Sequence, residues 1–405
     1  MHSFAKSNRE CHSAKTALQR NAPSERSLSE QRRFKRRLLG VINRRSQASN
    51  STIGLAMLER EKERYLNSPA VQSATLFDLR LRTYKLEDAL EAWVQEQQPP
   101  IVPRSYKRIP RSIVHWHPKR RQTSGFRKVC KLPLYLKLWH VLARDLIVAQ
   151  HQPRSHIGDW RDRGRDWQIK ALSNVIKGDQ QAVVMADINR AFPSVNFDAV
   201  YELPYLPEIL TRRAIDYRSI DFVGGWKNAC PWGVPSAMHD DLETAPSGLL
   251  EGSPVSNALF SVMLDDLPDH LDEGILPFVY CDNIVLVASN KEQARKAASA
   301  LVSYLSGHRF GPFQVTTEVR SVRDGFDHLG YSIYRRGNAV EVALSPRSWD
   351  KLVDRLDDRQ IKCSVTLRWL HASFGALSYN SMANCVQVIL EEEQRRALSS
   401  ASQAA

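Results

Sequence analysis

The stretch Pro277–Ala288, PFVYCDNIVLVA, decides the fold because it predicts a strand, a tight turn and a second strand. Two apolar runs flank Cys281-Asp282-Asn283, and Asp and Asn are residues that hairpin turns favour. A second apolar run, Ala182–Ala186, ends at Asp187 and predicts a buried strand. The carboxylates of Asp187 and Asp282 therefore each lie at the end of a predicted strand.

Helices and one more strand are predicted around these runs. The segments are a helix at Ser256–Leu267, an amphipathic helix at Lys291–Leu305 and a strand at Phe313–Val319. The order is strand, helix, strand, strand, helix, strand, which is typical of a ferredoxin-like split βαβ sheet in an α+β protein. In such a sheet the first strand lies beside the central hairpin, so we expect Asp187 and Asp282 to meet at one edge.

The flanking segments are mostly helical or basic. Ser27 and Glu30 predict a capping box that opens a basic helix to about Arg45, and a second helix is expected at Leu86–Gln97. The first helix is either a solvated basic helix packed by one apolar stripe or an RNA-facing helix. Further predicted segments are a cationic β-ribbon around Gly125, a loop at Arg163–Arg165 before a helix at Gln168–Ile176, and a mostly helical region over the last 70 or so residues.

Composition narrows the class of protein. A chain of 405 residues suggests two or three packed subdomains. A net charge of +13 fits either a polyanionic partner or a merely basic surface, and charge alone does not separate the two. No apolar stretch is long enough to span a bilayer, so we expect no membrane association. The six cysteines lack paired CxxC spacing, which indicates reduced thiols and a cytoplasmic location rather than disulfides.

Two carboxylates at one sheet edge have a chemical use. Two Mg²⁺ ions held about 4 Å apart by hard oxygen ligands can clamp the attacking and leaving oxygens of phosphoryl transfer. Taken singly, each signal is weak, because Asp at a strand end and Asp-Asn in a hairpin suit their local structure without any chemistry.

Four motifs strengthen this interpretation. In chain order they are Asp187–Phe192 (DINRAF), Gly248–Asn257 (GLLEGSPVSN), Tyr280–Asn283 (YCDN) and Phe326–Tyr331 (FDHLGY). Their order and distances resemble the reverse transcriptase family, which includes retron, group II intron and phage-defence polymerases. The resemblance covers roughly residues 110 to 335 and matches the family's first Asp motif, its glycine-rich motif, its YxDD hairpin and its primer-gripping FxFLG turn.

The resemblance implies a role for each matched residue. Asp187, Asp282 and the backbone carbonyl of Ile188 would hold two Mg²⁺ ions, for which Mn²⁺ can substitute, and Asn283 would complete the catalytic turn. Phe192 would be the steric gate against a ribose 2′-OH, with a core Phe as the alternative. The remaining implied contacts are nucleotide binding by Arg127, Lys119, Arg120, Glu251, Gly252 and Ser253, and a primer grip at His328, Leu329 and Gly330.

The family fold implies a right-hand polymerase with fingers, a ferredoxin-like palm and a helical thumb, preceded by a helical basic N-terminal extension. We expect the extension at residues 1–100, fingers at 101–180, palm at 181–335 with an insertion at about 196–247, and the thumb at 336–405.

Three positions depart from the family pattern. Asn283 replaces the second Asp of the hairpin, and an amide brings no charge, so metal affinity or rate should fall. Glu251 stands where the family places an uncharged or basic residue; it either marks unusual nucleotide or template choice or forms a salt bridge with a fingers arginine. No lysine lies between Phe313 and Tyr334, where the family often has a proton donor, and Thr316 or Arg320 occupies that neighbourhood.

The leading hypothesis is an RNA-directed DNA polymerase that adds dNTPs on an associated noncoding RNA, with a DNA product, in a bacterial anti-phage defence system. Two alternatives stay open: template-independent or protein-templated DNA synthesis, and a weakened polymerase fold that acts as an RNA-binding or assembly subunit. A second copy of the chain or a second polymerase subunit is a further candidate partner. The sequence is silent on template identity, priming mode, oligomeric state and product sequence.

Overall fold

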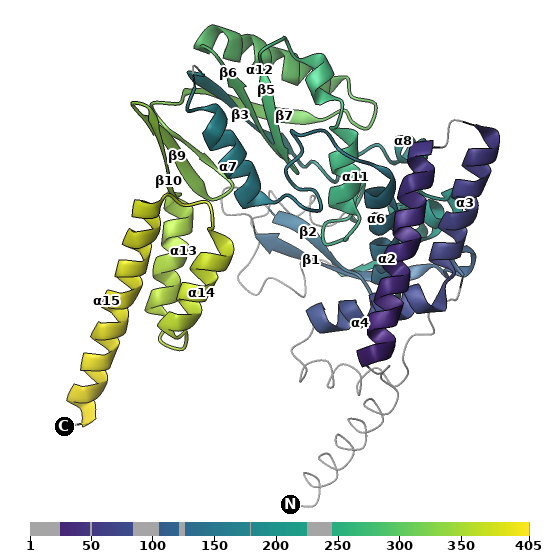
Figure 1. The fold of residues 1–405 in the computed structure, drawn as a ribbon, viewed down its shortest axis with the longest axis horizontal. Coiled ribbons are helices and arrows are strands. Elements are labelled where there is room, and N and C mark those ends of the chain that lie inside the picture. The colour runs from purple at the N-terminus through teal and green to yellow at the C-terminus, as the bar shows by residue number, and fades with distance from the viewer. Residues whose placement is uncertain are drawn as a thin grey trace, which may run out of the picture. The chain divides into compact units, whose positions relative to one another are not determined.

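The computed structural model describes residues 25–48, 51–83, 105–120, 126–178, 180–224 and 245–404 (Figure 1). The chain forms two compact units, each built from two stretches of sequence. The first unit is Met1–Gln152 with Phe192–Phe260, and the second is Pro153–Ala191 with Ser261–Ala405. The helix predicted at Leu86–Gln97 lies outside the described residues. The boundaries of the four predicted domains remain predictions.

The second unit contains a four-stranded sheet in the order β5-β6-β3-β7, with every neighbouring pair antiparallel. Its strands are β3 (Ala182–Asn189), β5 (Leu276–Tyr280), β6 (Asn283–Ala288) and β7 (Gln314–Ser321). The first strand in the chain therefore lies between the hairpin and the last strand, which confirms the split βαβ order predicted from the sequence.

Apolar patterning explains why these segments form the sheet. β6 is buried from Ile284 to Ala288, and β3 is buried at Ala182, Val183 and Val184. Helix α12 (Lys291–Ser306) packs on β3, β6 and β7 through an apolar stripe that includes Leu301 and Leu305, and Figure 1 shows it alongside the sheet. Continuous apolar strands covered by an amphipathic helix form the core of this part of the unit.

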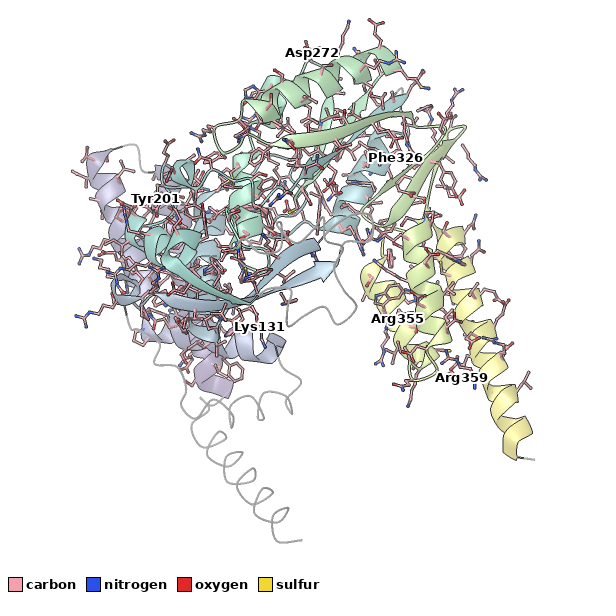
Figure 2. All side chains as sticks on the ribbon, turned by 180° about the vertical axis from the view of Figure 1, so that it is seen from behind. Lys131, Tyr201, Asp272, Phe326, Arg355 and Arg359 are labelled. Atoms are coloured by element: carbon pink, nitrogen blue, oxygen red, sulfur yellow. The ribbon has the colours of Figure 1, made fainter. Side chains whose placement is uncertain are left out.

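A second, smaller sheet and four helices complete this unit. The sheet has the order β10-β9-β8 and consists of β8 (Phe326–His328), β9 (Tyr331–Arg336) and β10 (Ala339–Leu344). The helices are α7 (Arg165–Val175), α13 (Pro346–Asp357), α14 (Cys363–Ser373) and α15 (Tyr379–Ala404). One buried apolar cluster runs from Val285 of the four-stranded sheet through Phe326, labelled in Figure 2, to Leu370 of α14. The predicted helical C-terminal region is confirmed from Pro346 onward, whereas β10 was not foreseen.

The first unit combines helices with a three-stranded sheet. Its longer helices are α2 (Glu25–Ala48), α3 (Thr52–Leu66), α4 (Pro69–Thr83) and α6 (Leu134–Gln150). The sheet has the order β2-β1-β4 and consists of β1 (Ser112–Arg120), β2 (Phe126–Lys131) and β4 (Ile220–Gly224). β1 pairs antiparallel with β2, as the predicted cationic ribbon requires, and parallel with β4.

Short helical segments connect these elements. They are η1 (Tyr106–Arg108), α8 (Phe197–Val200), α9 (Glu208–Leu210), η2 (Thr211–Ile215), η3 (Tyr217–Ser219) and η6 (Leu267–His270). Helix α11 (Ser256–Met263) carries the chain from the first unit to the second. The boundary between the two units falls within this helix, between Phe260 and Ser261.

The basic helix α2 packs against the rest of the first unit through one apolar stripe, and one of its cations forms an ion pair within that unit. Leu28, Leu38 and Ile42 are buried, and Lys35 forms an ion pair of 2.7 Å with Asp145 of α6. The predicted capping box is wrong, because the helix begins at Glu25 and Ser27 lies inside it. Among the described residues, no helix has the length and apolar character needed to cross a membrane.

Candidate active site

The hairpin of β5 and β6 ends in a two-residue turn in the second unit. Tyr280 and Asn283 are paired across the hairpin, which leaves Cys281 and Asp282 at its tip. Cys281 adopts a left-handed backbone conformation with φ of 56°. A residue with a Cβ pays a conformational cost there, so the surrounding structure has to hold this turn in place.

The pairing of β3 with β6 brings the predicted carboxylates together. Asp187 lies directly opposite Asn283 in the ladder, and the Ile188 N–H donates a hydrogen bond of 3.0 Å to the Asp282 carbonyl. Asp187 is exposed and Asp282 is half-buried, although the adjoining parts of β3 and β6 are largely buried. Four residues predicted from the sequence, Asp187, Ile188, Asp282 and Asn283, thus share one end of the sheet.

This donor set suits a Mg²⁺ site that depends on substrate. Among the described residues, no group of three or more His, Cys, Asp or Glu side chains is arranged to hold a metal ion. Mg²⁺ is commonly held by one or two carboxylates together with substrate phosphates and water, and Asp187 with Asp282 supplies that share. The Asn283 amide donates a hydrogen bond of 2.9 Å to Asp282 Oδ1, so it competes for one of the oxygens that would bind the ion.

Neighbouring β7 places a hydroxyl rather than a lysine next to this end of the sheet. Thr316 lies opposite Asp187 in the ladder, and its hydroxyl accepts a hydrogen bond of 3.2 Å from the Asn189 amide. Arg320, the other residue considered for this place, lies opposite Val183 and pairs with Glu318 at 2.6 Å. Of the two, Thr316 is therefore the one beside Asp187.

The glycine-rich segment packs backbone against backbone in the first unit. Gly248 has φ of 62°, and a Cβ there would lie 2.2 Å from the Phe192 carbonyl oxygen. Gly252 has φ of 93°, and a Cβ there would lie 2.6 Å from the Cys130 carbonyl oxygen. Both positions therefore require glycine for left-handed backbone and for close approach.

Ser253 is fixed by a buried histidine that sequence reasoning missed. The Nε2 of His140 lies 2.6 Å from the Ala214 carbonyl, and its Nδ1 lies 2.6 Å from the Ser253 hydroxyl. Because the carbonyl can only accept, Nε2 carries the proton and Nδ1 accepts from Ser253 in the neutral ring. Burial lowers the pKa of His140 to about 4, which keeps the ring neutral at pH 7.

The unusual glutamate of this segment is paired. The Glu251 carboxylate lies 3.6 Å from the Arg127 guanidinium, and the Glu251 carbonyl accepts a hydrogen bond of 2.8 Å from the Cys130 N–H. The salt bridge expected as one explanation of Glu251 is therefore present. Lys119 and Arg120 lie on β1 opposite Arg127 and Phe126, but their side chains are outside the described part of the structure.

Phe192 is half-buried in the first unit. Its ring packs edge-on against Phe260 of α11, with 5.5 Å between the ring centroids, and its carbonyl accepts the Leu249 N–H at 2.9 Å. The glycine-rich segment thus fixes the backbone of Phe192, and the side chain stays partly exposed. This arrangement is compatible with either role predicted for the ring.

The predicted primer-grip residues form the turn between β8 and β9. Leu329 and Gly330 both have positive φ, 52° and 87°, as a two-residue hairpin turn of the mirror-image type requires. His328 is buried and its Nε2 lies 3.4 Å from the Gln168 side-chain amide of α7. A Cβ on Gly330 would lie 2.8 Å from the Ser348 hydroxyl at the start of α13.

A cleft lies beside this turn. The sequence predicted only the basic loop at Arg163–Arg165 that forms part of its lining. The cleft has a volume of about 490 Å³ and includes Tyr280 of the hairpin, Arg163 and Trp167 in its lining. Arg163 lies over the Trp167 ring at 5.1 Å, and Arg165 lies over the Phe374 ring at 4.7 Å. We call this surface, lined by residues 162–167, Tyr280 and Ala372, the Trp167 cleft.

More cations lie close to the Trp167 cleft. Burial together with the charges of Arg347 and Arg165 lowers the pKa of Lys351, so these three side chains of the second unit repel one another. Cations gathered beside an exposed aromatic ring, here Trp167, are a common arrangement for binding a nucleic-acid strand.

The state of His140 predicts a loss of stability in acid. The folded pKa of about 4 is below the ordinary value near 6.5. The neutral ring therefore contributes fully to the free energy of unfolding above pH 6.5, and this contribution is lost as the pH falls toward 4. Between pH 7 and pH 5 this amounts to at most about 2 kcal/mol. Urea unfolding at both pH values should show a smaller pH effect in His140→Gln than in the wild type; an equal effect in both proteins would contradict this assignment.

The Asn283–Asp282 hydrogen bond predicts a gain in metal affinity on substitution. Asn283→Asp removes the competing donor and adds a negative charge, so the apparent affinity for Mn²⁺ should rise several-fold, about 1 kcal/mol. Titration of Mn²⁺ by electron paramagnetic resonance measures this directly. Asn290→Asp, at the far end of β6, makes the same charge change and should leave the affinity unaltered.

No protein-family model and no curated protein matches this chain. Two solved structures with which it shares similarity are telomerases. Apo telomerase from Candida tropicalis shares 13% identity with a TM-score of 0.42, over 77% of this chain and 62% of that one. Telomerase from Candida albicans in complex with the TWJ fragment of telomeric RNA shares 13% identity with a TM-score of 0.41, over 77% of this chain and 58% of that one. The chain thus spans less than two thirds of either telomerase, and we base the proposed function on the residues and geometry of the site.

Proposed function

We propose that this chain is an RNA-directed DNA polymerase, with the fingers, palm and thumb layout of a reverse transcriptase. The observation that carries the proposal is that Asp187, near the end of β3, and Asp282, in the β5–β6 turn, lie at the same end of a split βαβ sheet. Each Asp suits its local structure, but their convergence from distant parts of the chain supplies the paired carboxylates that two-metal chemistry uses.

In this proposal Asp187 and Asp282 hold Mg²⁺, or Mn²⁺ in its place, together with the backbone carbonyl of Ile188. When bound, two such ions neutralise charge on the triphosphate and on the attacking 3′-oxygen. The chain's own part is to hold both carboxylates on buried strands, so that the ligands are positioned before the nucleotide arrives.

Nucleic-acid binding is supported by charge and by aromatic surface. The net charge of +13 favours a polyanion, and the Trp167 cleft combines one exposed ring, Trp167, with arginines in the same unit as the carboxylates. We assign an RNA template to the chain, with dNTPs as substrates and DNA as product. A noncoding RNA as template and a role in bacterial anti-phage defence follow from the family resemblance of the motifs.

A weakened polymerase that serves as an RNA-binding subunit is the second candidate. Asn283 engages Asp282 Oδ1, and Arg127 is partly neutralised by Glu251, so both features reduce the attraction for metal and triphosphate. A neutralised Arg127 also favours slow synthesis. The two candidates differ in whether any DNA is made.

Polymerase activity is tested with the purified protein and its co-purified nucleic acid. Incubation with each dNTP and Mg²⁺ or Mn²⁺ should give DNA that RNase pretreatment abolishes. Asp187→Ala should lower the rate by at least about a thousandfold, since it removes a proposed metal ligand, whereas Asp272→Asn, an exposed carboxylate labelled in Figure 2, should not. RNase-resistant DNA would favour template-independent synthesis, and absence of DNA under every condition would favour the RNA-binding subunit.

Sugar selection is tested at Phe192. Removing the ring in Phe192→Ala should increase ribonucleotide incorporation relative to deoxynucleotide by about tenfold or more, because the 2′-OH no longer meets a steric barrier. Competition between a dNTP and its matching rNTP measures the ratio. Phe260→Leu, which changes only the buried partner ring, should lower thermal stability without changing the ratio. Unchanged discrimination in Phe192→Ala would assign that ring to the core.

A further inference from the structure

A carboxylate outside the four motifs lies beside the catalytic hairpin. The segment before Asp159 runs parallel to β5: Val279 donates its N–H to the His156 carbonyl at 2.8 Å, and Gly158 donates to the Val279 carbonyl at 2.7 Å. The bridge pairs Ile157 with Val279, so two residues further along the same register Asp159 is level with Cys281. Backbone pairing therefore determines where this carboxylate lies.

Asp159 is attached on two sides. Its Oδ1 accepts a hydrogen bond of 2.9 Å from the Ser261 hydroxyl of α11, and Ser261 is 1% exposed. The backbone N–H of Cys281 lies near enough to the carboxylate to lower its pKa, whereas the charge of Asp282 raises it. Burial raises the pKa of Asp159 to about 6, as expected for a carboxyl group largely removed from water.

The turn that Asp159 contacts is the one that needs support. Cys281 is left-handed at φ 56°, a conformation that costs a residue with a Cβ about 1 kcal/mol or more. Attraction between a backbone N–H and a nearby carboxylate can offset that cost. Asp282 follows Cys281 directly, so the backbone of Cys281 sets the direction in which the Asp282 side chain leaves the turn.

We propose that Asp159 is a positioning residue, whose carboxylate holds the left-handed Cys281 and thereby orients Asp282 in the active site. The kinetic effect expected of Asp159 rests on the proposed polymerase function. Its effect on the conformation of the Cys281 turn does not. We assign Asp159 to the turn because the parallel pairing of Ile157 with Val279 brings it level with Cys281 and Ser261 holds its Oδ1 there. Its Oδ2 is buried and has no hydrogen-bond partner within the described residues, so the carboxylate is held chiefly through Oδ1.

The kinetic test separates positioning from binding. Asp159→Ala should lower kcat for dNTP addition about tenfold or more, with the KM for dNTP unchanged within about twofold, because a misdirected Asp282 affects reaction more than nucleotide binding. Asp159→Asn keeps one acceptor oxygen and should recover part of kcat. Asp272→Asn, on the loop before β5, serves as the matched control and should behave as the wild type.

A second measurement does not depend on activity. Hydrogen exchange followed by mass spectrometry should show faster exchange in the peptide containing Tyr280–Asn283 in Asp159→Ala and, to a smaller extent, in Ser261→Ala. Thermal unfolding midpoints identify any variant that merely fails to fold, in which case Asp159→Asn decides. Unchanged exchange in this peptide, or unchanged kcat in an active enzyme, would overturn the inference. If the wild type makes no DNA, the proposed function fails and the exchange experiment alone decides the role of Asp159.

Discussion

The antiparallel pairing of β3 with β6 is the constraint on which the site depends. It places Asp187 opposite Asn283 and joins Ile188 to Asp282 through a backbone hydrogen bond. Buried side chains on both strands define the register, since a slip by one residue would turn every apolar side chain to the other face of the sheet. The shared location of Asp187 and Asp282 is therefore maintained by the free energy of packing the core.

The residues that depart from the family pattern have partners within the chain. Asn283 donates to Asp282, and Glu251 pairs with Arg127. An amide in place of a carboxylate turns repulsion with Asp282 into a hydrogen bond, and a paired glutamate carries less net charge toward phosphate. The same contacts that make these substitutions compatible with the fold reduce the electrostatic attraction for metal and nucleotide. For the proposed polymerase function, slow or specialised synthesis is the expected consequence.

The supports of the site lie far along the chain from the residues they hold. Asp159 contacts the Cys281 turn, and His140 contacts Ser253 across the glycine-rich segment. Both groups are removed from water, and both are attached through backbone or hydroxyl partners rather than through opposite charges. Such contacts fix the geometry of the site at little electrostatic cost. His140 is uncharged at neutral pH, and the charge of Asp159 is hydrogen-bonded.

The sequence by itself determined the four-stranded sheet and the placement of Asp187 and Asp282, because apolar runs and turn residues act locally and the order of segments limits the topology. It misplaced the start of α2, where a plausible capping box lies inside the helix, and it gave no sign of β10 or of the parallel pairing of β1 with β4. Only the tertiary structure decided that Asp159 lies beside the Cys281 turn, that Glu251 is paired and that His140 is neutral. Each of these depends on which distant groups share a desolvated space, and no local pattern of residues encodes that.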